Sequence, residues 1–245
     1  MYALEVRSLA KSFGGLHVIK DVSFSVSPGE RRLILGPNGA GKTTLFNLIA
    51  GDIKPSNGQI SLAGQDISPL PTHRRAACGI GRTFQILTLF AGETLLRNVM
   101  LAALGRLSTR WHPFRNMNRD EGLTEVAMGI LKQVHLDHVA RRQVSETSYG
   151  ERRRLEIAMA LAQKPRLLLL DEPLAGLSRE ERKTVGALLD ELPRDLTILM
   201  IEHDMDVALA FAERIALLHH GTLLVDGSRE EVIADRRTKE AYLAQ

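Results

Sequence analysis

A glycine-rich segment near the N-terminus constrains this chain more than any other feature. It consists of Gly36, Pro37, Asn38, Gly39, Ala40, Gly41, Lys42, Thr43 and Thr44. An apolar run precedes it and a helical pattern follows, which is the strand, turn and helix order of a phosphate-binding loop. Glycines let the backbone approach a triphosphate with N–H groups turned inward, and the helix N-terminus adds a positive field.

Two side chains of this segment carry specific chemistry. Lys42 is placed to reach the β- and γ-phosphates of a nucleoside triphosphate, and the Thr43 hydroxyl is placed to coordinate Mg²⁺. The alternative is a glycine-rich turn that holds a lysine by chance. The matching strand and helix patterns on either side argue against that alternative.

Composition excludes several classes of protein. The chain has 245 residues, 44% of them hydrophobic and 25% charged, as in an ordinary soluble globular protein. Its single cysteine, Cys78, excludes an internal disulfide and a cysteine-rich metal cluster. The formal net charge is only +3, without a Lys/Arg block typical of a nucleic-acid tail. No apolar run approaches the ~18 residues that span a bilayer, so we expect a cytoplasmic chain that reaches a membrane through a partner.

Hydrophobic patterning in the first half predicts strands and then helices. Residues 2–7 and 18–26 alternate as antiparallel strands, which we place beside the strand of the phosphate loop, and 59–62 forms another strand. Strand signals disappear over 87–146, where helical patterns surround an irregular excursion from Gly105 to Gly122. That excursion is either a solvated surface loop or a partner-facing part of a helical subdomain.

The second half returns to an α/β pattern. Apolar runs at 167–170 and 196–201 are typical of central strands that are buried on both faces. Ser178 and Ser228 are each followed three residues later by glutamate, which predicts capping boxes at two helix starts. Further elements are a helix over 151–163 and a hairpin of strands 215–218 and 223–226 around Gly221.

Two carboxylates follow the apolar strand at 167–170. Asp171 is placed to hold Mg²⁺ directly or through water, and Glu172 is placed to take a proton from an attacking water. An Asp-Glu pair after an apolar strand is common by chance. Together with the upstream phosphate loop, it predicts hydrolysis of a nucleoside triphosphate.

The segment from Ser148 to Arg152 precedes a helix and predicts a second anion site. A serine near the N-cap followed by a glycine can bind an anion at the helix N-terminus, although the simpler interpretation is a plain N-cap. A chain with both sites can close on a twin of itself. Each ATP would then lie between the loop of one subunit and the helix start of the other.

The order of these motifs resembles the nucleotide-binding subunit of an ABC transporter over essentially the whole chain. The resemblance implies an α/β P-loop NTPase fold, the ABC nucleotide-binding domain, as a single domain over 1–245. Its implied parts are a RecA-like core with an antiparallel β subdomain at about 1–86 and 164–230, a helical signature subdomain at about 87–163, and C-terminal helices at about 229–245.

The resemblance also implies a role for each matching residue. Phe13 stacks on adenine, and Gly36 to Thr44 are the Walker A loop. Gln85 is the Q-loop glutamine, which touches Mg²⁺ and the lytic water. Asp171 and Glu172 are the Walker B aspartate and the catalytic glutamate. His203 is the switch histidine at the γ-phosphate.

The remaining roles concern the dimer and the metal. Ser148, Gly150 and Glu151 belong to the signature motif, which contacts the ATP of the partner subunit. Mg²⁺ is held by Thr43, Gln85 and Asp171, and catalysis uses Lys42, Gln85, Glu172 and His203. His219 and His220 match no motif and receive no role.

Two motifs depart from the commonest form of the family. The signature has Tyr149 and Glu151 where Gly and Gln are usual, and we expect anion binding to persist because the backbone and Ser148 perform it. The D-loop over 175–178 ends in Ser178 where Asp is usual. Ser178 keeps the capping role but removes a carboxylate near the dimer seam, so communication between the two sites is the function most affected.

Local strings are similar to the ATP-binding subunits of branched-chain amino acid importers. They lie at 70–74, 81–85, 148–158, 201–205 and 240–243. Such importers pair two ATPase subunits, as a head-to-tail homodimer or heterodimer, with two permease subunits and indirectly with an extracytoplasmic solute-binding protein. The resemblance places this chain peripherally on the cytoplasmic face of the cell membrane, with no nucleic-acid partner.

Three alternatives remain open at this point. A lipid-exporting ABC ATPase carries the same motifs. A soluble ABC ATPase in DNA repair or translation usually has two cassettes, or a coiled-coil or zinc insertion, and this chain has neither. A non-catalytic nucleotide-binding module would not need the full set of catalytic residues.

Overall fold

The chain folds into two compact units. A computed structural model describes residues 1–84, 88–105, 120–202 and 209–243. The first unit comprises 1–80, 166–172 and 193–245, and the second comprises 81–165 and 173–192. The second unit therefore includes 173–192, a segment that the sequence interpretation assigned to the core.

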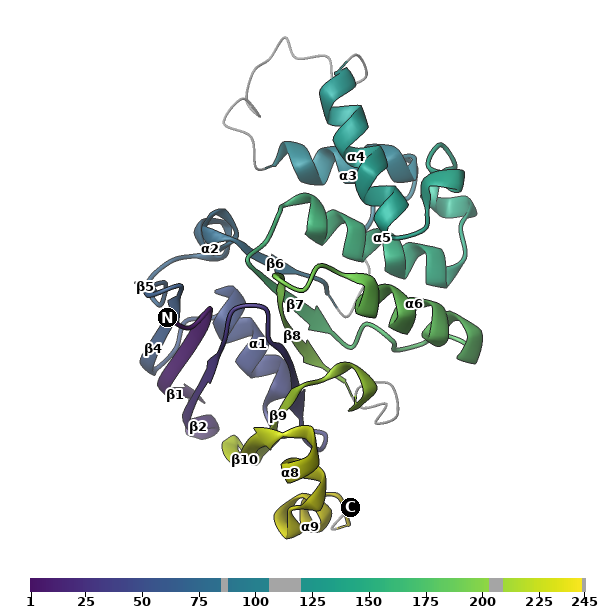
Figure 1. Cartoon of the computed structure of the whole chain (residues 1–245). Helices are drawn as coiled ribbons and strands as arrows, with labels where there is room; N and C mark the ends of the chain where they lie inside the picture. The colour runs from purple at the N-terminus through teal and green to yellow at the C-terminus, as the bar shows by residue number, and fades with distance from the viewer. Residues whose placement is uncertain (85–87, 106–119, 203–208, 244–245) are drawn as a thin grey trace. The chain divides into compact units, whose positions relative to one another are not determined.

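The first unit contains a four-stranded antiparallel sheet with strand order β2-β1-β4-β5 (Figure 1). Its strands are β1 (Leu4–Phe13), β2 (Leu16–Val26), β4 (Asn57–Leu62) and β5 (Gln65–Asp66). β1 and β4 alternate between buried and more exposed residues at the positions where they pair. This alternation suits a sheet with one face on the core.

A second, six-stranded sheet has the order β10-β9-β3-β8-β7-β6. Its strands are β3 (Arg31–Leu35), β6 (Ile80–Arg82), β7 (Leu167–Asp171), β8 (Thr197–Ile201), β9 (Arg214–His219) and β10 (Thr222–Ser228). The run β9-β3-β8-β7 is parallel, and β10 returns antiparallel to β9. The buried strands and the hairpin around Gly221 are thus confirmed.

The expected position of the N-terminal strands beside the phosphate-loop strand is wrong. The neighbours of β3 are β9 and β8, whereas β1 pairs with β2 and β4. Every residue of β3 is buried, which suits the middle of a parallel sheet covered on both faces. The alternating strands β1 and β2 instead form a separate sheet.

Helix α1 (Lys42–Ala50) shares one hydrophobic core with strands of both sheets. Phe46, Leu48 and Ile49 of this helix are fully buried. The same core includes Leu4 of the four-stranded sheet and Leu199 of the six-stranded sheet. Full burial of one such side chain stabilises the fold by about 1.5–3 kcal/mol. The helix that follows the phosphate loop is therefore fixed from both sides.

A buried arginine on α2 (Thr72–Cys78), a helix that the sequence patterns did not predict, closes the other end of α1. Arg75 is 1% exposed and donates from Nη1 to the carbonyls of Leu48 at 2.6 Å and Ile49 at 2.9 Å. These carbonyls lie in the last turn of α1, where a cation is favourable. Burial lowers the pKa of the Arg75 guanidinium, and Asp66 and Asp52 oppose that shift.

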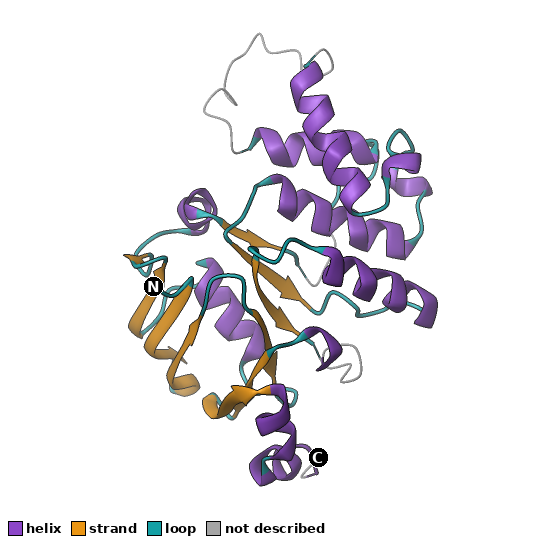
Figure 2. Ribbon diagram, viewed as in Figure 1, coloured by secondary structure: helices purple, strands orange, loops and turns teal. Residues whose placement is uncertain are grey.

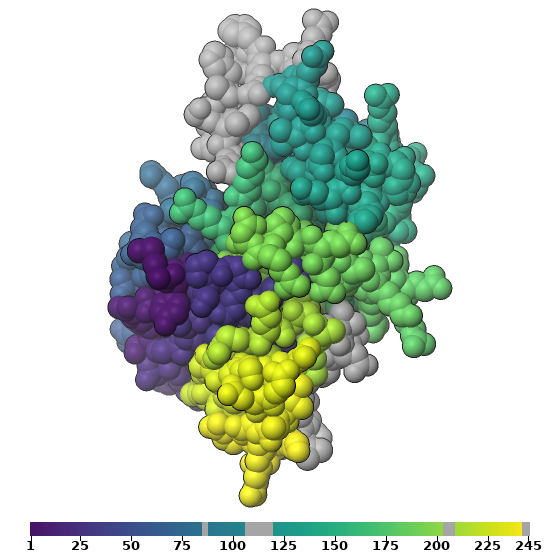
Figure 3. Space-filling view, in the orientation of Figure 1, coloured from purple at the N-terminus to yellow at the C-terminus, as the bar shows by residue number. Residues whose placement is uncertain are grey.

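The N-terminal and C-terminal parts of the first unit touch. The backbone N–H of Lys20 in β2 donates to the carbonyl of Gly221 in the β9–β10 turn at 2.7 Å. In the space-filling view, the purple N-terminal strands lie beside the yellow C-terminal residues (Figure 3). The chain ends in α8 (Arg229–Ala234) and α9 (Arg236–Leu243). Of the helices that the structure describes, none is long and apolar enough to cross a membrane.

Helices form most of the second unit (Figure 2). They are α3 (Leu95–Leu104), α4 (Glu121–Gln133), the 3₁₀ turns η3 (Asp137–Val139) and η4 (Val144–Glu146), α5 (Tyr149–Ala162) and α6 (Arg179–Glu191). Both predicted capping boxes are confirmed, at Ser178 for α6 and at Ser228 for α8. Most of the predicted Gly105–Gly122 excursion lies outside the described residues.

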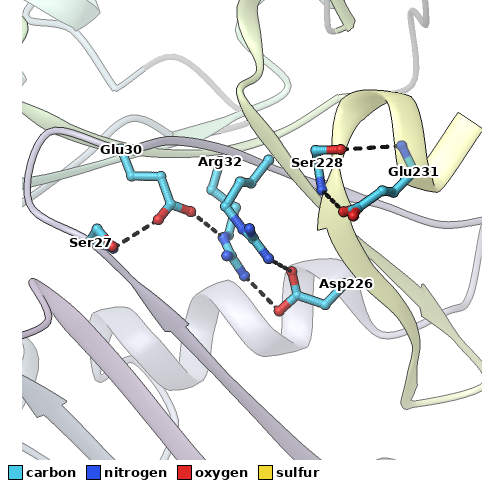
Figure 4. A network of polar contacts seen from close by, with 7 residues as sticks. Ser27, Glu30, Arg32, Asp226, Ser228 and Glu231 are labelled. Atoms are coloured by element: carbon cyan, nitrogen blue, oxygen red, sulfur yellow. Dashed lines mark hydrogen bonds and ion pairs between the residues drawn. The ribbon is translucent and has the colours of Figure 1, made fainter.

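A buried ion-pair network ties β3 to β10 in the first unit (Figure 4). Arg32, 2% exposed, donates from Nε to Glu30 at 2.7 Å and from Nη1 to Asp226 at 3.0 Å. Glu30 also accepts from the backbone N–H of Ser27 at 2.9 Å. Removing one partner of a buried pair leaves an uncompensated charge, which costs far more than the loss of an exposed pair.

We predict that Arg32→Ala lowers the free energy of unfolding by about 3–5 kcal/mol, because it leaves Glu30 buried without its cation. Urea denaturation followed by circular dichroism measures this change. Arg7→Ala is the matched control, since Arg7 pairs with Glu5 at the surface, and it should cost about 1 kcal/mol or less. Equal losses in the two variants would contradict the role of the network.

Candidate active site

The predicted phosphate loop connects β3 to α1, and the side chain of Lys42 bonds back to the main chain at the start of the loop. Nζ of Lys42 donates to the carbonyl of Gly36 at 2.6 Å and to that of Pro37 at 3.0 Å. The backbone N–H of Ala40 donates to the Pro37 carbonyl at 3.2 Å. Nothing lies within 4 Å of the position that a Cβ would take at Gly39. The space beside Gly39 at the tip of the loop is therefore open.

The β9–β10 hairpin braces this loop from behind. Gly36 has φ 154°, and a Cβ at this position would collide with the carbonyl oxygen of Leu218. The backbone N–H of Gly221 donates to the carbonyl of Ala40 at 3.0 Å. The sequence patterns predicted the hairpin but not this contact, because it joins positions far apart in the chain.

Lys42 lies in a field of two carboxylates. Its side chain is 8% exposed, and burial lowers the pKa of its ammonium below the usual range. The charges of Glu172 and then Asp171 oppose that shift, because they favour the protonated form. The first unit thus brings together Lys42, Asp171 and Glu172, which the sequence placed about 130 residues apart in two motifs.

The two carboxylates sit at a sharp turn at the end of β7. Asp171, 2% exposed, is paired with Ile201 in the parallel ladder with β8. Glu172 has φ 47°, a left-handed conformation that costs a residue other than glycine about 1–3 kcal/mol. Its backbone N–H donates to the Ile201 carbonyl at 3.0 Å, which holds the turn. Backbone strain of this kind is concentrated at functional sites.

A second buried carboxylate, after Asp171, lies at the end of the neighbouring strand. Glu202 follows β8 directly and is 1% exposed. The sequence interpretation gave it no role, and its only signal was an acidic residue after an apolar run.

Phe13, the predicted adenine contact at the end of β1, is 49% exposed, and Nζ of Lys11 lies 4.9 Å from its ring centroid. The Phe13 ring is accessible for stacking.

The oxygen donors of this site fit Mg²⁺. Thr43 is an exposed residue in the first turn of α1, and Asp171 lies at the end of β7. Hydroxyl and carboxylate oxygens are hard ligands, and Mg²⁺ is commonly held by one or two of them together with substrate phosphates. Within the described ranges, no group of three His, Cys, Asp or Glu side chains could hold a metal by itself.

The signature segment forms the N-terminus of α5 in the second unit. Ser148 is the N-cap, and its Oγ accepts from the backbone N–H of Glu151 at 3.1 Å. The Glu151 carboxylate in turn accepts from the backbone N–H of Ser148 at 2.7 Å. Glu151, one of the departures from the common motif, thus completes a capping box. Gly150 is buried beside it.

A buried ion pair on α5 holds the main chain of Phe84, the residue before the predicted Q-loop glutamine. Arg153 donates to Glu156 at 2.7 Å, and their side chains are 1% and 6% exposed. Glu156 accepts from the Phe84 N–H at 2.6 Å, and Arg153 donates to the Phe84 carbonyl at 2.8 Å and to the Pro173 carbonyl at 3.1 Å. The sequence interpretation used these two residues only as part of a family string.

Gln85 and His203 lie outside the described residues. His219 ends β9 and His220 lies in the hairpin turn, with their ring centroids 4.1 Å apart.

Comparison with known proteins assigns the family. The family model described as "ABC transporter" matches residues 19–175. The chain belongs to the ABC transporter family. It is 37% identical to the high-affinity branched-chain amino acid transport ATP-binding protein BraF of Pseudomonas aeruginosa and 38% identical to LivG of Escherichia coli K12. Each alignment covers 99% of this chain and 98% of the relative.

Solved ABC cassettes share the whole fold. An ATP-binding cassette of an ABC transporter in its ADP conformation matches with a TM-score of 0.88 and 28% identity over 100% of both chains. A dimeric cassette in a post-hydrolysis state, bound to ADP and phosphate, matches with a TM-score of 0.79 and 26% identity over 92% of this chain and 98% of that one. The 245-residue chain described above is therefore itself an ABC cassette, an α/β P-loop NTPase that binds ATP, and its activity is ATP hydrolysis.

We predict that Lys42→Ala in the ABC cassette weakens ATP binding by about 10- to 100-fold, since a charged hydrogen bond is worth about 1.5–3 kcal/mol. Titration with a fluorescent ATP analogue measures the dissociation constant. Lys54→Ala removes an exposed lysine elsewhere on the same unit and is the matched control. Unchanged affinity in Lys42→Ala would count against the loop as the phosphate site.

Proposed function

We propose that this cassette energises the uptake of an amino acid, branched-chain or similar, or of another small solute. The full-length similarity to BraF and LivG, both named as branched-chain amino acid transport proteins, carries this proposal. In it, the whole chain works as one ABC ATPase domain. It acts on the cytoplasmic face of the cell membrane, beside two permease subunits that receive solute from an extracytoplasmic binding protein.

In this proposal the phosphate loop and β7 hold and cleave the substrate. Lys42 contacts the β- and γ-phosphates, and Phe13 stacks on the adenine. Glu172 accepts a proton from the attacking water, while His203 contacts the γ-phosphate. Mg²⁺, bound by Thr43, Asp171 and Gln85, would neutralise charge on the phosphates. The transition state needs mainly positioning and charge stabilisation, which these groups supply.

Two copies complete each site. ATP on the loop of one copy meets Ser148, Gly150 and Glu151 at the start of α5 in the other, where the helix N-terminus favours an anion. The related dimeric cassette bound to ADP and phosphate supports a dimer as the working form. The partner is a second copy of this chain or a different ATPase subunit. Release of ADP and phosphate reopens the pair.

Lipid export is the second candidate function. The lipopolysaccharide export ATP-binding protein LptB of Acidithiobacillus ferridurans is 38% identical over 241 residues, covering 98% of this chain and 96% of LptB. Identity alone therefore does not separate the two functions. The alignments with BraF and LivG cover 99% of this chain and 98% of each relative, and this fuller coverage favours the importer.

The test is a mild-detergent purification of the tagged cassette from its native membranes, followed by mass spectrometry of the proteins that accompany it. Two permease subunits and a second, shorter ATPase would support the importer. Components of lipid export would overturn it and leave the ATPase assignment intact. The Lys42→Ala cassette is the control for nucleotide-dependent association.

We predict that Glu172→Gln slows ATP hydrolysis by about 10²- to 10⁴-fold, the contribution of a general base. ATP binding should persist, because the loop and Lys42 are unchanged. Phosphate release at saturating ATP measures the rate, and a fluorescent ATP analogue measures the affinity. Glu191→Gln, a change at an exposed glutamate that ends α6, is the control. A fully active Glu172→Gln enzyme would contradict the assignment of Glu172 as the general base.

A further inference from the structure

Two glutamates already occupy backbone N–H groups at the start of α5. Glu151 accepts from the N–H of Ser148 at 2.7 Å, and Glu181 accepts through Oε1 from the N–H of Gly150 at 3.0 Å. Glu151 belongs to the capping box of α5 itself. Glu181 comes from a different helix, 31 residues further along the chain. An acid from α6 thus fills a position that the proposed function gives to the ATP of a partner.

The reach of Glu181 depends on how α6 begins. Ser178 is the N-cap of α6, and the Oε2 atom of Glu181 accepts from its backbone N–H at 3.0 Å. The carboxylate therefore bridges two helix starts, one with each oxygen. The capping box of α8 has the same design, and there Glu231 accepts from Ser228 at 2.7 Å. A capping box thus works without a contact to a second helix.

Close packing fits the two segments to each other. A Cβ at Gly150 would lie 2.6 Å from Oε1 of Glu181 and 2.9 Å from its Cγ, so a side chain at position 150 would displace this carboxylate. A Cβ at Gly176 would lie 3.3 Å from the ring of Tyr149. Gly176 has φ 74° and belongs to the D-loop. The signature segment therefore lies against the D-loop at Gly176 and against the first turn of α6 at Glu181, both within the second unit.

Glu181 carries its negative charge at neutral pH. Hydrogen bonds from Ser178, then the backbone of Gly150 and the charge of Arg154, hold the pKa of this carboxyl below its usual range. A negative charge at a helix N-terminus is favourable. It also repels any second anion that approaches the same N–H groups.

We propose that the Glu181 carboxylate is an internal substitute for the γ-phosphate. It accepts from the Gly150 N–H in the open subunit, and it is displaced when the partner's ATP binds there. This inference rests on the proposed head-to-tail dimer. One N–H serves one strong acceptor at a time, so the carboxylate and the phosphate compete. Glu181 thereby places a carboxylate three residues after Ser178, the D-loop residue that stands where aspartate is usual. Its competition with the phosphate raises the ATP concentration needed for closure.

The test compares ATP-driven dimerisation in the hydrolysis-deficient Glu172→Gln background. Glu181→Gln keeps the capping box, because glutamine suits that position as well as glutamate. It removes the charge, and because its single carbonyl oxygen accepts from Ser178, it presents a donating NH₂ group instead of an acceptor to the N–H of Gly150. We expect the ATP concentration at half-dimerisation to fall by about fivefold or more, the scale of a charge-assisted hydrogen bond. Analytical ultracentrifugation across an ATP titration provides this measurement.

Glu180→Gln is the matched control. Glu180 is an exposed residue in the same first turn of α6, so the variant makes the same charge change without touching Gly150. Its half-dimerisation concentration should stay within about twofold of the background, as for an exposed surface charge. ATP affinity of the separate subunits, measured with a fluorescent analogue, should be equal in all variants.

The outcomes separate this inference from the proposed function. If Glu181→Gln and Glu180→Gln dimerise at the same ATP concentration, or Glu181→Gln needs more ATP, the inference is overturned and the dimer stands. If the Glu172→Gln background stays monomeric at saturating ATP, closure on a second copy of this chain is excluded, and this inference, which needs that closure, fails with it. Equal melting temperatures of the variants exclude unfolding as the cause of a shift.

Discussion

The burial of α1 in a core shared with two sheets is the constraint on which the site depends. A phosphate loop binds its ligand only if the helix behind it stays in place, and Phe46, Leu48 and Ile49 fix that helix by full burial. Arg75 adds a cation at the far end of the helix, where carbonyls would otherwise lack partners. The N-terminal end is thus left to face the phosphates, with its positive field uncompensated by any acidic residue in its own first turn.

Local patterns predicted the parts of the fold that local physics decides. The phosphate loop, the buried strands β7 and β8 and the capping boxes of α6 and α8 all follow from spacing and turn chemistry within a few residues. The placement of β1 and β2 beside β3 was wrong, because alternation says that a strand is half-buried but not which sheet it joins. Helix α2 escaped prediction, since it is short and its main feature, Arg75, makes long-range contacts.

The candidate site divides in the same way. Lys42, Asp171 and Glu172 were predictable because each belongs to a motif with its own strand and turn, and parallel strands bring their carboxyl ends to one edge of the sheet. Gln85 and His203 rest on family resemblance alone, since neither has a local signal that distinguishes it from a surface residue. The Glu181 contact to Gly150 was beyond sequence reasoning, because it depends on how two helix starts meet. The capping box placed Glu181 on α6 without indicating its second partner.

The grip of Arg153 and Glu156 on Phe84 has a consequence for how such a cassette can diversify. The pair holds Phe84 by its N–H and carbonyl, groups that every residue except proline presents. The side chain at position 84 is 43% exposed and takes no part in these main-chain hydrogen bonds. Evolution can exchange the side chain to suit a different neighbour while the course of the backbone into the next residue stays the same. The main-chain hydrogen bonds from Arg153 and Glu156 thus leave the residue type at position 84 free to change.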